Sequence, residues 1–488
     1  MSMSGLMVTI IRRAIAPWVL DILPEKYPET LSGFVTFALS SNDPSLVGLG
    51  LLSIAASIQQ LDSNHEHILR QLPSPQADLF YKYLNCVDAL ILNDSYYASS
   101  MVGLGVGVLA AKLLMNLGLI RKAWLLIHRS ISYGQILGLQ SQQRSQTEPE
   151  TVISRRERTW SYLCELDLYI SLLIGLPYAA ISSTMQTDRH VRQGTTSWFQ
   201  SRLLKLATRT IDRNQAGLEL SSILSQDLHR DAELAAYEMD RNFWDAPAEL
   251  MLQRIDRSEY MERITSQLWY HHICVFIHMP LMIQSIEDPA LENHRTACLA
   301  GSREALKTYH IMRSDPLAAF KLEKLIDYQT FICATLLLLG KLGSGFLPNG
   351  SEQSHYDRDW ELIESTLEIL RRVSTTSNNL IAAQALQGLE TLASLARNFH
   401  LQHGKCQTPS LKIVVPFSGT ITIFPGSSIK CSRDSSAQSL NVQPLFTLSN
   451  GFNNEGENQY PSIDFSWDNM IGMTTEDNWA WLPDLSTT

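Results

Sequence analysis

The sequence predicts an all-α protein built as a large array of packed antiparallel helices. Hydrophobic residues recur at helical spacing from about residue 21 to about residue 400, and the alternation typical of strands is almost absent there. The chain has 488 residues, of which 45% are hydrophobic and 18% are charged, so it is long enough to bury a large core. No repeat of fixed period occurs, and a regular solenoid is therefore not predicted.

The first helices are expected before residue 120. Pro44 suits the first turn of a helix that Asp43 would cap, and Asp78 is expected to cap the next one. Residues 101–119 are the most apolar stretch, but glycines and Lys112 interrupt it. Because a membrane span needs about 20 predominantly apolar residues, this stretch predicts a buried helix.

A pair of helices is expected in the middle of the chain. Residues 122–137 form an apolar pattern that stops at Gly138, a typical helix-ending residue. The polar residues 140–154 predict a loop, and residues 155–174 predict the second helix of the pair.

Further helices are predicted by apolar periodicity over residues 268–279, 297–312, 325–339, 360–373 and 379–399. The first of these is expected to break at Pro280, because proline cannot donate the helical hydrogen bond. The polar segments 186–194 and 344–359 are predicted to be loops.

The composition changes after residue 400. Residues 411–415 and 419–424 are rich in β-branched side chains and predict two short strands that pair as a hairpin. A lone hairpin is marginally stable in water, so this one should pack on the helical body. The expected organisation is an N-terminal segment (1–20), a helical domain (21–400), a hairpin or linker (401–433) and a tail (434–488).

The tail, residues 434–488, contains no Lys or Arg and mixes acidic with aromatic side chains. The residues that give it this character include Phe465, Trp467, Asp468, Trp479, Trp481, Leu482 and Asp484. Such a composition is typical of a disordered activation segment, whose aromatic side chains enter an apolar groove on a partner. The alternative is a tail that packs its tryptophans on its own helical body.

The segment from residue 155 to residue 177 carries the most informative motif. Its characteristic residues are Arg156, Arg158, Trp160, Asp167, Gly175 and Pro177. Together with the preceding helix it resembles the core of the fungal-specific transcription factor domain, the regulatory middle region of fungal zinc-cluster transcription factors. Leu168 and Leu176 stand where arginine is usual in that family, so this chain has less positive charge there.

Asp167 lies on the apolar stripe of its predicted helix, between Leu163 and Ile170. A carboxylate on a buried face needs a charged or hydrogen-bonding partner. If the helices of residues 122–137 and 155–174 pack antiparallel, Arg129 lies at the right height. We therefore expect an Arg129–Asp167 ion pair, within about 4 Å, with a structural role. A ligand-binding role for Asp167 is the alternative.

A second group of candidate residues is His271, His272, Cys274 and His278. Cys274 and His278 are four residues apart and would share a helix face, as metal ligands can. No acidic ligand or paired cysteine accompanies them, and core or interface histidines are the favoured interpretation. The sequence has no GxSxG elbow, P-loop or HExxH motif, so nothing supports an enzyme, and no cofactor is expected.

The family resemblance implies a non-enzymatic, nuclear regulator of transcription, which could be specific for one pathway, including secondary metabolism. Nothing in the sequence resembles the six-cysteine zinc cluster that grips DNA in that family, and the seven cysteines are scattered. The formal charge of -10 also argues against direct DNA binding by the chain as a whole.

The expected partners are therefore a second copy or a DNA-binding zinc-cluster protein, together with co-activators for the tail. A gene model truncated at its start would equally explain the missing cluster. The alternative outside transcription is a helical scaffold or a small-molecule sensor. A pocket with convergent polar groups would favour that alternative.

Overall fold

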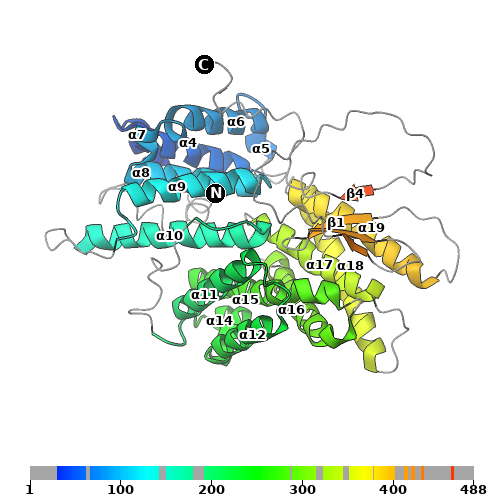
Figure 1. Cartoon of the computed structure of the whole chain (residues 1–488). Coiled ribbons are helices and arrows are strands. Elements are labelled where there is room, and N and C mark those ends of the chain that lie inside the picture. Colours follow the sequence, from blue (N-terminus) through cyan, green and yellow to red (C-terminus); the bar gives the residue numbers. More distant parts are fainter. Residues whose placement is uncertain are drawn as a thin grey trace, which may run out of the picture.

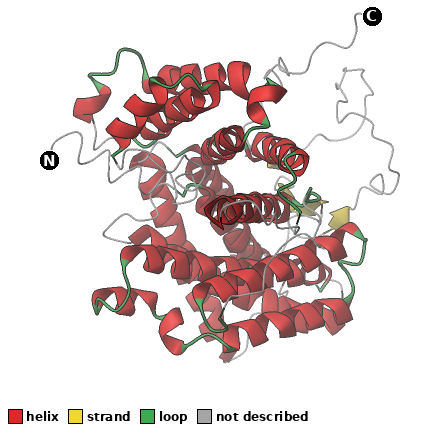
Figure 2. Cartoon of the chain, turned by 90° about the vertical axis from the view of Figure 1, so that its left-hand side faces the viewer, coloured by secondary structure: helices red, strands yellow, loops and turns green. Residues whose placement is uncertain are grey.

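The structure is a computed structural model, and it describes most of the chain between residues 30 and 465. The described parts are residues 30–61, 66–141, 150–179, 192–285, 288–314, 323–343, 351–376, 379–401, 411–415, 419–423, 430–432 and 463–465. Helices dominate these parts, and the predicted all-α array is confirmed. Figure 2 shows the same dominance, with the few strands gathered at one side of the molecule.

The N-terminal helices form a layer on one side of the long helix α10 (Glu150–Ile174), as Figure 1 shows. They are α3 (Leu31–Leu39), α4 (Pro44–Gln59), α5 (Glu66–Leu69), α6 (Gln76–Val87), the π-helix η2 (Asp88–Leu92), α7 (Ser95–Ala98), α8 (Met101–Asn116) and α9 (Ile120–Ile136). Helix α9 contacts both α8 and α10, so it connects this layer to α10.

The remaining helices lie below α10 or beyond its right-hand end in Figure 1. They are α11 (Thr196–Gln215), α12 (Ser222–Tyr237), α13 (Arg241–Trp244), α14 (Ala246–Met251), α15 (Arg257–Gln284), the 3₁₀ turn η4 (Pro289–Leu291), α16 (Glu292–Ser314), α17 (Leu325–Gly343), α18 (Ser351–Thr376) and α19 (Leu380–Leu401). Helices α15 and α16 pack along each other, and residues 272–283 of α15 are all buried.

Both predicted helices are present, and the predicted N-cap is borne out for α4 but not for α6. Pro44 opens α4, and the Asp43 side chain accepts a hydrogen bond from the Ser45 amide at 2.9 Å. Helix α6 instead begins after Pro75, which places Asp78 inside the first turn rather than at the cap. An acidic residue is also favourable in the first turn, because its negative charge interacts with the positive end of the helix dipole. An acidic residue at the cap and one in the first turn therefore look alike in the sequence.

Helix α8 is a buried helix, as predicted, with Ser100 capping its start. Within the described residues, none of the helices combines the length and apolar composition that crossing a membrane requires. Cys86, Cys164, Cys274, Cys298 and Cys333 are free thiols.

Two predicted loops are shorter than expected. Helix α10 starts at Glu150 rather than Arg155, and α18 starts at Ser351 rather than Trp360. The added turns are polar and contain good helix formers such as Glu352 and Gln353. They carry no apolar stripe, so hydrophobic periodicity could not distinguish them from loops.

The predicted break at Pro280 is wrong, because α15 continues through Pro280 to Gln284. Proline removes the donor for the carbonyl four residues earlier, which is that of Phe276. The Arg213 guanidinium of α11 donates to that carbonyl at 3.3 Å, and to the carbonyl of Ile277 at 2.8 Å. A charged side chain from another helix therefore replaces the missing backbone donor.

The predicted hairpin is present. Strands β1 (Leu411–Val415) and β2 (Gly419–Ile423) pair antiparallel, with Leu411 opposite Ile423. Strand β3 (Lys430–Ser432) extends the sheet beside β2, and β4 (Ile463–Phe465) pairs parallel to β1. Three residues of the tail are thus in a strand, and the rest of residues 434–488, predicted to be disordered, lies outside the described residues.

Candidate functional site

The candidate site lies where α9 packs on α10 and where the chain leaves α10. Trp160 of α10 is only 4% exposed and lies against Gly134 of α9. A Cβ atom added at Gly134 would lie 3.2 Å from the Trp160 ring, which is closer than ordinary packing. The two helices therefore approach closely because α9 has glycine where α10 has its tryptophan.

Arg156 stabilises the end of α9 from the neighbouring helix. The chain turns at Gly138, whose φ is +70°, so the last carbonyls of α9 lack helical partners. The Arg156 guanidinium donates to the Leu137 carbonyl at 2.9 Å. A cation at a helix C-terminus also complements the helix dipole. Arg158 of the same motif is exposed on α10.

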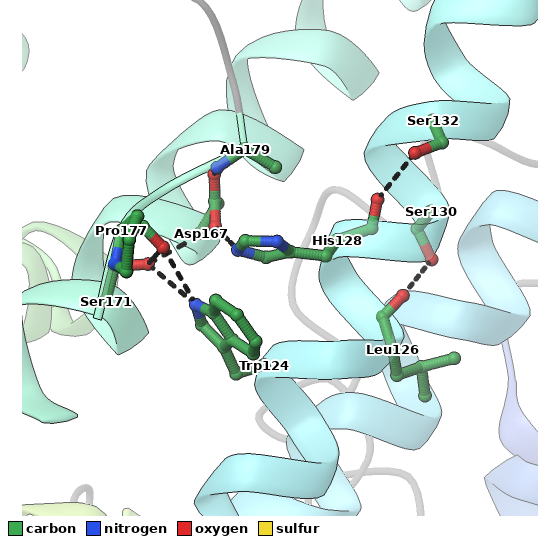
Figure 3. Close-up of polar contacts among 9 residues, drawn as sticks. All are labelled: Trp124, Leu126, His128, Ser130, Ser132, Asp167, Ser171, Pro177 and Ala179. Carbon is green, nitrogen blue, oxygen red and sulfur yellow. Dashed lines mark hydrogen bonds and ion pairs between the residues drawn. The ribbon is translucent and has the colours of Figure 1, made fainter. Parts of the chain in front are cut away.

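Asp167 is completely buried and holds the segment that follows α10 (Figure 3). Its Oδ2 accepts a hydrogen bond from the Ala179 amide at 2.7 Å. Its Oδ1 lies 3.4 Å from the Ser171 hydroxyl, a longer contact within the same helix. The carboxylate thus fixes a backbone donor twelve residues downstream, and these contacts favour the structural role for Asp167.

The turn after α10 reverses at Gly175, whose φ of +72° favours glycine. The Leu176 amide donates to the Ser171 carbonyl at 3.1 Å, which closes the helix end. The Pro177 carbonyl then accepts from the Ser171 hydroxyl and from the Trp124 indole, both at 3.1 Å. Gly175 and Pro177 therefore return the chain to the α9–α10 interface.

The predicted Arg129–Asp167 pair is wrong. Nε2 of His128 lies 3.1 Å from Oδ1 of Asp167, within ion-pair distance but without the geometry of a hydrogen bond. Arg129 instead donates to Asn93 Oδ1 at 3.3 Å. Neighbouring residues on a helix point about 100° apart, so only one of the two can face α10.

The ring of Trp124 holds His128 in place. The two ring centroids are 3.8 Å apart, and Figure 3 shows both side chains projecting from α9 toward Asp167 and Ser171. The Trp124 indole N–H also lies 3.0 Å from the Ser171 hydroxyl. We call Trp124, His128, Asp167, Ser171 and Pro177 the α9–α10 hub. Trp124 and His128 were not identified as site residues from the sequence, because they look like ordinary residues of an amphipathic helix.

The candidate metal ligands do not converge. His272 lies with Nε2 3.6 Å from the Cys333 sulfur, whereas His278 lies with Nδ1 2.9 Å from Nδ1 of His294. His271 is near the Trp244 ring. In the part of the chain that the structure describes, no three His, Cys, Asp or Glu side chains gather as metal ligands would.

Burial governs the charge of these histidines. Desolvation lowers the pKa of His272 to about 3, with a smaller contribution from the neighbouring His271. Desolvation, followed by the nearby His229, His294 and Arg213, lowers the pKa of His278 to about 3. Both rings are therefore neutral core groups near neutral pH, as the favoured interpretation expected.

A second buried network joins α16, α17 and the start of α19. Asp327, with no exposed surface, accepts from Arg313 Nη2 at 2.6 Å, from Tyr309 at 2.8 Å and from Asn379 at 2.6 Å. An acidic residue at the start of an apolar helix was the only sequence signal for it. The partners are far apart along the chain, so their meeting could not be deduced.

A shallow groove separates α18 from α19. It is lined by Glu364, Leu367, Arg371, Glu390, Ala393, Ser394 and Arg397. Its charges pair with each other across the two helices, because Arg371 lies 2.7 Å from Glu390 and Arg397 lies 2.6 Å from Glu364. These mutual ion pairs join the two helices to each other.

The chain is similar to fungal regulators of transcription. It is 24% identical over 423 residues to the transcription factor sdnS of Sordaria araneosa, covering 82% of this chain and 54% of that protein. It is 22% identical over 366 residues to a dehydrocurvularin biosynthesis regulator of Alternaria cinerariae, covering 72% and 47%. It is 26% identical over 253 residues to the transcription factor eupR of a Phoma species, covering 50% and 54%.

The chain spans about half the length of the curated relatives that it matches. No protein-family model matches the chain, and no solved structure matches it. These relatives carry the names of transcription factors and pathway regulators rather than of enzymes.

Proposed function

We propose that this chain is a pathway-specific regulator of transcription that acts in the nucleus on a set of secondary-metabolite genes. The observation that carries the proposal is the similarity along 82% and 72% of the chain to a transcription factor and to a biosynthesis regulator. A match of that extent includes the helical body rather than one short motif. The fungal-specific transcription factor domain is the region that we assign to residues 21–400.

The geometry of the α9–α10 hub favours a structural rather than a catalytic role for its residues. Its acidic residue, Asp167, has no exposed surface and its partners are side chains and amides of the protein itself. A catalytic carboxylate must reach a substrate, which this burial prevents. The hub instead fixes α10 against α9, and α10 separates the two groups of helices in Figure 1.

The proposed route to DNA is indirect. The chain has a formal charge of -10, which opposes binding to a polyanion unless a partner supplies positive charge. We propose that the helical body associates with a second copy or with a DNA-binding zinc-cluster protein. The acidic and aromatic tail, residues 434–488, then contacts co-activators through its tryptophans.

A tethering experiment tests this function. The whole chain is fused to a heterologous DNA-binding module, and transcription of a reporter with the matching sites is measured in a fungal host. The proposal expects activation above that of the module alone. Changing Trp467, Trp479 and Trp481 to alanine should abolish the activation, because the aromatic side chains provide the apolar contact with the partner.

The matched control changes three polar residues of the same tail, Asn453, Asn454 and Asn458, to alanine, and it should leave activation intact. Equal activation by the tryptophan and asparagine variants would contradict the role of the tail. A fusion that neither activates nor represses the reporter would favour the helical scaffold or sensor outside transcription.

A further inference from the structure

The outward face of α12 carries three exposed apolar side chains, although this helix lies at the edge of the described structure (Figure 1). Its inner face is buried through Ser225, Leu228, Ala232 and Ala235. On the opposite face Ile223 is 74% exposed, Leu234 is 57% exposed and Tyr237 is 86% exposed. Single exposed apolar residues are common on protein surfaces, but three in line on one short helix indicate a contact surface.

These residues follow the spacing of a helix-packing seam. Ile223, Asp227, Arg230, Leu234 and Tyr237 are separated alternately by four and three residues. This is the spacing of the a and d positions of a heptad, which keeps all five side chains on one side of the helix. We call these five residues the α12 stripe. Its two charged members, Asp227 and Arg230, lie at its centre and pair with each other at 2.7 Å.

The order of residues in the α12 stripe makes it complementary to a reversed copy of itself. Read forward from Ile223 to Leu234, it runs apolar, acidic, basic, apolar, with gaps of four, three and four residues. Read backward, the gaps and the apolar ends are the same, but the acidic and basic positions are exchanged. An antiparallel second copy therefore places Ile223 against Leu234, and Asp227 against Arg230.

A parallel copy would have the opposite effect. It would place Asp227 on Asp227 and Arg230 on Arg230, and like charges facing each other in a contact are unfavourable. Charge order thus favours the antiparallel over the parallel orientation of a second copy. A two-fold axis between the copies is also the commonest symmetry of protein dimers.

We propose that the α12 stripe is the contact through which two copies of this chain associate, with their α12 helices antiparallel about a two-fold axis. A helix of 16 residues is about 24 Å long and presents less than the ~800 Å² per partner of a standard interface. The dimer is therefore concentration-dependent and exchanges readily. The proposed function includes self-association, and this inference names the surface through which it occurs. The inference rests on the proposed function only for the expectation that two copies associate.

Sedimentation velocity of the purified full-length chain tests the contact apart from any effect on transcription. Between about 1 and 100 μM the wild-type chain should change from monomer to dimer. Ile223→Arg and Leu234→Arg should each remain monomeric, because they bury an unpaired charge in the contact. The control is Ile136→Arg at the end of α9, where the isoleucine is equally exposed at 75%, and this variant should dimerise like wild type.

Charge reversal tests the orientation. Asp227→Arg alone and Arg230→Asp alone should each weaken self-association at least about tenfold, through like charges in the contact. An equimolar mixture of the two variants should dimerise again, since each then supplies the charge that the other lacks. The double variant, in which both charges are exchanged, should also dimerise.

Circular dichroism should show unchanged helix content in every variant, because the substituted side chains are on the surface. A wild-type chain that stays monomeric throughout the concentration range would overturn the proposal. So would dimers that persist in Ile223→Arg, or a mixture of the charge variants that fails to associate. None of these results depends on whether the chain regulates transcription.

Discussion

The imidazole of His128 on α9 lies 3.1 Å from the carboxylate of Asp167 on α10. This contact joins the last helix of the N-terminal layer to the helix that separates it from the rest of the described structure. Because Asp167 has no exposed surface and also accepts from the Ala179 amide, one buried carboxylate contacts both helices and the segment that follows them.

Asp167→Ala should lower the free energy of unfolding by about 2–3 kcal/mol, because it removes a buried carboxylate and leaves the Ala179 amide without its acceptor. Urea unfolding followed by circular dichroism measures the loss. The control is Asp240→Ala, since Asp240 is exposed and its side chain makes no cap hydrogen bond. A loss in Asp167→Ala no larger than in this control would show that the hub contributes nothing to stability.

A double-mutant cycle distinguishes His128 from Arg129 as the partner of Asp167. His128→Ala and Asp167→Ala should show a coupling free energy of about 1 kcal/mol, because the two side chains are in contact. Arg129→Ala should be additive with Asp167→Ala, since Arg129 bonds to Asn93. Coupling to Arg129 and additivity with His128 would reverse this assignment.

The role of Arg213 in supporting α15 at Pro280 can be tested by restoring the missing backbone donor. Arg213→Met should destabilise the chain by about 2–3 kcal/mol, because the carbonyls of Phe276 and Ile277 lose their charged donor. Adding Pro280→Ala should recover part of that loss, since alanine restores the helical N–H to the Phe276 carbonyl. Thermal unfolding of both variants measures the recovery. No improvement on adding Pro280→Ala would contradict this explanation of the unbroken helix.

Acid should destabilise the fold through its buried histidines. Burial lowers the pKa of His272 from 6.5 to about 3, so between these values the unfolded chain binds a proton that the folded chain does not. Stability therefore falls as pH drops below about 6.5, and from pH 7.5 to pH 5.5 this histidine costs about 1 kcal/mol.

His272→Gln should reduce that pH dependence by about the same 1 kcal/mol, which urea unfolding at the two pH values measures. The matched control is His67→Gln, because His67 is exposed on α5 and its replacement should leave the pH dependence as in wild type. An unchanged pH dependence in His272→Gln would mean that this ring is not held neutral by burial.

The helical array could be predicted because apolar periodicity marks each buried face, and Gly138 and Asp43 marked helix ends by their own local chemistry. Pro280 was misread because its compensation comes from Arg213, 67 residues earlier in the chain. The rule that proline breaks a helix considers only neighbouring residues, so it cannot predict a donor from another helix.

The candidate site was predicted only in part, again because some of its contacts depend on how distant parts of the chain pack. Asp167 was recognised as buried because it interrupts an apolar stripe. The choice between His128 and Arg129 depends on the rotation of α9 about its axis, which two neighbouring polar residues do not reveal. The predicted tail residues Trp467, Asp468, Trp479, Trp481, Leu482 and Asp484 lie outside the described residues, so their role stays a prediction.

Transcript sequencing in the source organism, with and without the gene for this chain, measures whether the chain regulates transcription. Deletion should change the transcripts of one set of biosynthetic genes, and restoring the wild-type chain should reverse the change. Asp167→Ala should reverse it less completely at the same protein level, because the hub holds the regulatory body together. Transcripts that are indistinguishable between the deleted and restored strains would contradict a role in transcription.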